Sequence, residues 1–122
     1  MLLVDTSVWS NHLRRHHAPL ARQLEARQVL THPFVIGEIA CCAFPSRAEA
    51  LAALNALPSA PLLGQTEILG FIERHALAGR GVGFVDIHLL ASSLVAGARL
   101  WTHDRRLAEA AAGLGVVIHT GH

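Results

Sequence analysis

The chain contains no lysine: of its 122 residues ten are basic, and all ten are arginine. Arginine differs from lysine in presenting a planar fork of donors that matches phosphate and carboxylate groups. A lysine-free, arginine-rich composition is also what a GC-rich genome encodes, so the bias alone assigns no function. The formal net charge is only +1, so the overall charge does not indicate a nucleic-acid-binding protein either.

Cysteine and long apolar runs are also scarce. The two cysteines, Cys41 and Cys42, are neighbours in the sequence, which rarely form a disulfide, and no Cys/His spacing of a zinc site is present. No apolar run approaches the length of a membrane span, and the four residues before Asp5 are too few for a signal peptide. We therefore expect a cytoplasmic protein with no membrane partner.

Charged residues make up only 16% of the chain, against 52% hydrophobic residues. Such a chain can bury enough apolar surface to offset the entropy lost on ordering, which argues against disorder. Its length suits one domain and is short for two. We expect residues 1–122 to form a single domain.

Short apolar segments alternate with helical patterns along the whole chain. We expect strands at 1–4, 28–31, 100–102 and 116–119, and helices after Asp5 (fading in 14–17) and at 19–26, 33–42, 47–57, 67–77 (capped by Thr66), 85–96 and 105–114. Uniformly apolar short strands between helices are typical of a parallel sheet covered on both faces. The pattern predicts an α/β fold, a three-layer α/β/α sandwich with a short, Rossmann-like parallel sheet.

Three of the nine carboxylates are each the only charged side chain in a long apolar stretch: Asp5, Glu38 and Asp86. A fourth, Asp104, directly follows the short apolar run of RLWTHD. An ionised carboxylate that is buried needs a hydrogen-bonded partner, a shifted pKa or a metal ion. Since these segments supply no arginine to pair with them, the pattern indicates acids gathered around a cation.

Each acid also has a structural interpretation. Asp5 and Asp104 follow strands, at the sheet edge where sites of such folds lie, but both are equally good helix N-caps. Glu38 and Asp86 lie within apolar helical segments, where we expect no exposed face to hold a charge. This pair therefore carries more weight than Asp5 and Asp104.

Carboxylates without Cys or His ligand spacing suit hard cations, Mg²⁺ or Mn²⁺, rather than zinc. The matching chemistry is attack of metal-activated water on a phosphodiester. Two other acidic α/β classes fit less well. Phospho-acceptor receiver domains need a lysine near their acids, and phosphatases with an aspartate nucleophile need a second aspartate where Ser7 stands.

Four segments together resemble the PIN-domain pattern: VDTSVW, VIGEIA, GFVDIHLLAS and LWTHDRRL. The chain length and the sequence around these motifs are most similar to those of VapC-type toxins, the ribonuclease halves of toxin–antitoxin pairs. The resemblance implies a Mg²⁺- or Mn²⁺-dependent endoribonuclease that cuts structured RNA such as tRNA or rRNA, forms a homodimer and is neutralised by a cognate antitoxin. The alternative is a PIN-like module that binds RNA or a partner without cutting it.

The resemblance also implies roles for individual residues. The catalytic and metal-binding residues would be the four acids, Asp5, Glu38, Asp86 and Asp104. Supporting hydroxyls would come from Thr6, after the first acid, and Thr102, in the Thr-x-Asp element.

Several other residues are candidates without a clear role. Basic side chains near the acidic edge could hold RNA phosphates, namely Arg80, Arg105 and Arg106. The histidines beside two of the acids, His88 and His103, could act on RNA, but a lone histidine is more often a structural residue. An antitoxin groove and a dimer face could use the first helices and the helix from Ala48 to Leu57.

Overall fold

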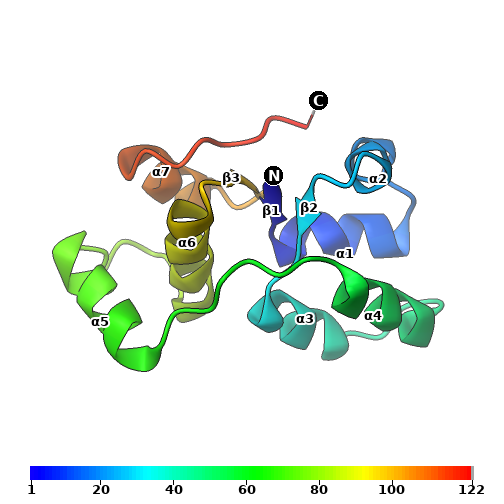
Figure 1. Cartoon of the computed structure of the whole chain (residues 1–122), viewed down its shortest axis with the longest axis horizontal. Helices are drawn as coiled ribbons and strands as arrows, with labels where there is room; N and C mark the ends of the chain where they lie inside the picture. Colours follow the sequence, from blue (N-terminus) through cyan, green and yellow to red (C-terminus); the bar gives the residue numbers. More distant parts are fainter. Residues whose placement is uncertain (122) are drawn as a thin grey trace.

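The chain folds around a short, three-stranded parallel sheet, as seen in a computed structural model that describes residues 1–121 (Figure 1). The strands are β1 (Leu2–Val4), β2 (Val29–Leu30) and β3 (Arg99–Trp101), in the order β2-β1-β3. Leu3 of the central strand pairs with Leu30 on one side and Leu100 on the other. Every strand residue except Arg99 is buried, as the apolar segments predict.

Helices cover the sheet on both sides. Within residues 1–121 these are α1 (Thr6–Arg14), α2 (Ala18–Glu25), α3 (Pro33–Ala40), α4 (Arg47–Ala56), α5 (Gln65–Arg74), α6 (Phe84–Ala96) and α7 (Arg105–Gly113). The first four gather on one side of the sheet, and α6 and α7 lie on the other with α5 outside α6 (Figure 1). The predicted α/β architecture with a short parallel sheet is confirmed.

Two local predictions need correction. Thr66 does not cap α5: the helix starts after Gly64, whose N–H donates to the Glu67 side chain at 3.1 Å, so the glutamate supplies the cap. The expected strand at 116–119 is reduced to one parallel bridge between Leu100 and Ile118. That segment still adds to the sheet edge, because the N–H of Leu100 donates to Val117 O at 2.9 Å.

The buried hydrophobic side chains form one cluster around the sheet. Its centre includes α6, in which all seven residues from Ile87 to Ser93 are buried. The expectation that this apolar segment has no exposed face holds for the middle part, whereas Leu94 and Val95 in the last turn are exposed. None of the helices within residues 1–121 is both long and apolar enough to cross a membrane.

A buried histidine fixes the start of α3. His32 is fully buried, and its Nδ1 accepts the N–H of Phe34 at 3.1 Å, so the ring caps the helix. Its Nε2 lies 3.2 Å from the hydroxyl of Ser92 on α6, and that hydroxyl donates to Pro61 O. Burial, with a smaller effect of His88, lowers the pKa of His32 to about 4, so the ring is neutral at physiological pH. The contact ties α3 to α6.

Candidate active site

The carboxyl ends of β1 and β3 meet at one edge of the sheet, where α1 and α7 begin. The N–H of Asp5 donates to Trp101 O at 2.9 Å, which joins the two strand ends directly. Asp5 and Asp104, the residues before the two helices, therefore lie at the same edge, as the alternation of strands and helices predicts.

Asp5 is the one buried member of the acidic quartet, with 6% of its surface exposed. Its Oδ1 accepts the N–H of Thr6 at 2.8 Å. Its Oδ2 accepts two hydroxyl groups, from Ser7 at 2.8 Å and from Thr102 at 2.7 Å. Three donors thus compensate the buried charge, since hydrogen bonds to a carboxylate favour its ionised form.

The same two hydroxyls also hold the segment that carries Asp104. Thr102 Oγ1 accepts the N–H of Asp104 at 3.0 Å, and Ser7 Oγ accepts the N–H of His103 at 3.0 Å. Asp104 is exposed, and its Oδ1 accepts the N–H groups of Arg106 and Leu107 at 2.9 and 3.1 Å. Asp104 therefore caps α7 with one oxygen, and its Oδ2 receives no hydrogen bond within residues 1–121.

The other two acids come from helices on opposite sides of the sheet. Glu38 lies on α3, and its Oε1 accepts the hydroxyl of Thr6 at 2.6 Å. Asp86 lies in the first turn of α6, where its Oδ2 accepts the N–H of Gly83 at 3.1 Å. Each carboxylate is thus held by one hydrogen bond from within the described residues.

The pKa of Asp86 responds to its burial and to the other three acids. Partial burial raises the pKa of Asp86, the N–H of Gly83 opposes this, and the negative charges of Asp5, Asp104 and Glu38 raise it further. An acid whose pKa responds to three others lies within electrostatic range of all of them. Residues that are up to 99 positions apart in the sequence form one negatively charged edge.

The burial of these acids differs from the expectation. Glu38 is exposed and Asp86 is half-buried, although both were expected to lack an exposed face. The reason is that one side of α3 is exposed: Glu38 lies there beside the small residues Gly37 and Cys41, the latter at the C-cap. Asp5, which could have been a mere cap, is both a cap and the buried charge.

The donor set fits a hard cation. In the described part of the chain, no three His, Cys, Asp or Glu side chains are packed closely enough to hold a metal ion on their own. Mg²⁺ retains several waters and commonly binds through one or two carboxylates together with substrate phosphates, so it does not need such a cage. Four oxygen-donor acids at one edge, one of them with a pKa raised by burial and by the charges of the others, therefore fit Mg²⁺ or Mn²⁺.

Comparison with known proteins adds an independent observation. A family model described as the PIN domain matches residues 2–113. The chain belongs to the PIN-domain family. Ribonuclease VapC32, from two strains of Mycobacterium tuberculosis, is 44% identical over 119 residues, which are 97% of this chain and 96% of the relative. The structure of FitAcB from Neisseria gonorrhoeae has a TM-score of 0.67, covers 99% of this chain and 98% of its own, and at 18% identity shows the fold alone.

One functional residue of this PIN domain escaped the sequence analysis. Ser7 entered only as an argument against a phosphatase, yet its hydroxyl binds Asp5 and orders the backbone before Asp104. The two threonines named from the resemblance lie where they can support the acids, since Thr6 contacts Glu38 and Thr102 contacts Asp5. The signal for Ser7 was the Asp-Thr-Ser run itself, because a hydroxyl two residues after an N-cap can reach back to it.

The three candidate arginines differ in their surroundings. Arg105 forms an ion pair with Glu109 at 3.3 Å, on a fully solvated helix face. Arg106 packs over Gly81, where a Cβ atom would come within 2.8 Å of the arginine side chain, so the loop before α6 touches the start of α7. Arg80 is exposed in that loop.

The two histidines beside the acids have structural surroundings. His88 is buried, with its ring against Phe34 and Phe84 at centroid distances of 4.6 and 4.8 Å, and burial lowers its pKa. It therefore packs α6 against the start of α3 as a neutral ring. His103 is exposed, and its ring lies 6.4 Å from that of His17.

Proposed function

We propose that this chain is a Mg²⁺- or Mn²⁺-dependent endoribonuclease and the toxin of a toxin–antitoxin pair, acting in the cytoplasm. The observation that carries the proposal is the arrangement of acids from distant segments at one sheet edge, where the hydroxyls of Ser7 and Thr102 link Asp5 to the segment of Asp104 and Thr6 binds Glu38. The likeness to Ribonuclease VapC32 over nearly the whole chain supports ribonuclease chemistry in particular. We expect structured RNA, such as tRNA or rRNA, as the substrate.

The metal would be held by Asp5, Glu38, Asp86 and Asp104. When bound, it would lower the pKa of a water molecule and offset charge that develops on the phosphate. The protein's part is to hold the carboxylates in place: Thr102 and Ser7 fix Asp5 to the segment of Asp104, and Thr6 orients Glu38. Because helix N-termini lie at this edge, the backbone also favours an anionic phosphate there.

Cleavage of purified tRNA and rRNA, with RNA ends mapped by sequencing, tests the proposal. We expect cutting with Mg²⁺ or Mn²⁺, none in EDTA, and recovery when the metal is restored in excess. Calorimetric titration with Mn²⁺ and no RNA measures binding at the acids separately. Undiminished cleavage in EDTA would contradict the metal-dependent proposal, and RNA binding with no cleavage under either metal would favour the non-catalytic alternative.

A groove between α1, α2 and α4 is a candidate site for the antitoxin. Its walls are mostly apolar and enclose about 240 Å³, formed by Trp9, His12, Leu13, Leu24, Ala50, Ala53, Leu54 and Leu57. An apolar groove between helices suits the apolar face of a partner helix. This surface overlaps the one expected from the sequence, the first helices and the helix from Ala48 to Leu57. We expect Ala53→Arg to abolish binding of the antitoxin and to leave RNA cleavage unchanged.

We further propose that the homodimer uses the surface where α5 meets the end of α6, on which Leu94 and Val95 are exposed beside Leu63 and Phe71. Large side chains exposed on neighbouring elements indicate an interface when they form a patch. Sedimentation of the purified chain at micromolar concentration should give a dimer, and Val95→Arg should shift it to a monomer. A wild-type monomer under these conditions argues against the dimer.

A further inference from the structure

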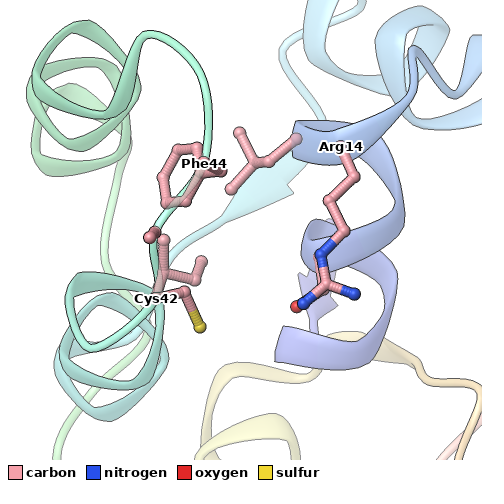
Figure 2. Close-up of a pocket in the computed structure, with 7 residues that line it drawn as sticks. Arg14, Cys42 and Phe44 are labelled. Carbon is pink, nitrogen blue, oxygen red and sulfur yellow. The ribbon is translucent and has the colours of Figure 1, made fainter.

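A second feature adjoins the acidic edge: a narrow groove between α1 and the end of α3. We call it the α1–α3 groove, and it is lined by Ser10, Leu13, Arg14, Ile39, Cys42, Ala43 and Phe44. Figure 2 shows Arg14 on α1 facing Cys42 and Phe44 on the segment that follows α3. The enclosed space is about 10 Å³, enough for one small group, so a larger ligand would lie along the rim.

The two helices that form the groove also carry residues of the acidic edge. On α1, Thr6, Ser10 and Arg14 are spaced four residues apart, so they share one helix face. On the other wall, Cys42 follows Glu38 by the same interval, and Thr6 donates to Glu38 at 2.6 Å. Because a helix rises about 1.5 Å per residue, Arg14 lies about 12 Å along α1 from Thr6.

Arg14 has no partner within residues 1–121: it takes part in no hydrogen bond and no ion pair there. Its guanidinium is directed back along α1 rather than away from it, as Figure 2 shows. Helical side chains lean toward the N-terminus, and here that direction leads toward Thr6 and the acidic edge. An unpaired cation on the groove wall therefore points toward the helix end that lies at the carboxylates.

We propose that the α1–α3 groove holds the RNA strand next to the cleaved bond, with Arg14 binding one of its phosphates. This inference rests on the proposed function, because the strand must start at the acidic edge. These charges suit an RNA strand. Its cleaved phosphate would lie at the acids, where a metal ion offsets the negative charge, and Arg14 would offset the charge of a second phosphate. Phe44 adds an aromatic wall beside Arg14, which suits a ribose or base.

Stabilisation of the helix dipole is the alternative role for Arg14, because it lies in the last turn of α1. Arg22 provides a matched control. It is exposed in the last turn of α2, so it has the same relation to a helix end, and it does not line the α1–α3 groove. Arg22→Ala and Arg14→Ala each remove one positive charge from the last turn of a helix.

The test measures binding of a short, fluorescently labelled single-stranded RNA across a salt series, with Ca²⁺ in place of Mg²⁺. We expect Arg14→Ala to weaken binding about threefold to tenfold and to reduce the slope of log K against log salt by about 0.7, the value for one phosphate contact on a single strand. Arg22→Ala should leave both unchanged. Ser10→Glu, which places a negative charge in the groove, should weaken binding more than Arg14→Ala.

The outcomes separate this inference from the proposed function. If wild-type protein neither binds nor cuts RNA, the proposed function fails first. If wild-type protein binds and cuts RNA while Arg14→Ala and Ser10→Glu bind it as Arg22→Ala does, the groove is not the strand site. That result overturns the inference. Thermal unfolding of all three variants checks that each is folded.

Discussion

The two halves of the acidic site are held in different ways. The strand-edge half, Asp5 and Asp104, lies where two strands end, and two hydroxyls link its carboxylate and backbone groups. The helix half, Glu38 and Asp86, has one hydrogen bond to each carboxylate. Asp5 is buried with its charge compensated, whereas Asp86 carries a raised pKa because burial and its neighbours disfavour its charge.

The two halves therefore have different roles: the strand-edge half mainly supports the fold, and the helix half mainly contributes negative charge. The strand-edge half joins β1 to β3 and caps two helices, so it should contribute to folding as well as to chemistry. The helix half gives the fold little and adds negative charge, and the raised pKa of Asp86 shows that the charge of this residue is disfavoured in the absence of a cation. Identical chemical changes in the two halves should therefore have different consequences.

The largest effect is expected from Asp5→Asn. It removes a proposed metal ligand, so we expect RNA cleavage to fall by at least about 1000-fold. It also turns an acceptor of three hydrogen bonds into an amide whose N–H groups face hydroxyl donors, which should destabilise the fold by about 1–3 kcal/mol. Cleavage assays and urea unfolding without metal measure the two effects.

Glu38→Gln is the matched change in the helix half. We expect cleavage to fall about 100-fold, while the free energy of unfolding stays within about 0.5 kcal/mol of wild type because the side chain is exposed. Equal destabilisation by both substitutions would contradict the proposed division of duties.

Asp86→Asn should reduce cleavage by about 100-fold, yet stabilise the metal-free protein. The pKa of Asp86 in the fold lies above its value of 3.8 in the unfolded chain, so stability from this group is present below 3.8 and is lost as pH rises through the folded pKa. Asparagine keeps an acceptor for the N–H of Gly83 and carries no charge. At a pH above the folded pKa of Asp86, thermal unfolding should therefore give a higher Tm for the variant than for wild type. A lower Tm would contradict this prediction.

The contribution of His32 to stability has the opposite pH dependence, so it must be separated from the contribution of Asp86. Its pKa is about 4 in the fold, against 6.5 in the unfolded chain, so its contribution is full above 6.5 and falls as pH is lowered toward 4. Both proteins contain His32, so the difference between wild-type and Asp86→Asn unfolding curves isolates the acid. Addition of Mg²⁺ should raise the Tm of wild type more than that of the variant.

Much of the fold could be predicted from the sequence because its signals are local. The apolar segments before Asp5 and Thr102 are strands, and the apolar run from 85 to 96 is a mostly buried helix. The start of α5 was misjudged because Thr66 resembles a cap, while the actual contact is made by Glu67. The segment at 116–119 has strand-like residues but lies at the sheet edge, where it makes a single bridge.

The sequence predicted which acids belong to the candidate site but not which of them are buried. Glu38 and Asp86 were expected to be the buried acids, and the structure instead buries Asp5. The exposed residues around Glu38 are small, so the hydrophobic periodicity of the sequence does not reveal the exposed side of α3. Ser7 was missed because its contacts reach Thr102 and His103, 95 and 96 positions away, and no local pattern reports such pairing.

A smaller effect is expected from Thr102→Val, which keeps the shape of the side chain and removes its hydroxyl. Asp5 Oδ2 loses one donor and the N–H of Asp104 loses its acceptor, so we expect a loss of stability of about 1–2 kcal/mol. Because such supporting contacts tune metal binding, Mn²⁺ affinity should fall about 10-fold to 100-fold. Ser7→Ala should behave similarly, since Ser7 makes the parallel pair of contacts.

The smallest effect is expected from Thr6→Val, the equivalent change in the helix half. Thr6 donates one hydrogen bond, to the exposed Glu38, so its loss frees that carboxylate without leaving a buried group unpaired. We expect Mn²⁺ affinity to fall by less than about 10-fold and stability to change by less than about 0.5 kcal/mol. Calorimetry and urea unfolding on Thr6→Val and Thr102→Val together give the sharpest comparison. If Thr6→Val destabilises the fold as much as Thr102→Val, the helix half is as structural as the strand-edge half, and the contrast between them disappears.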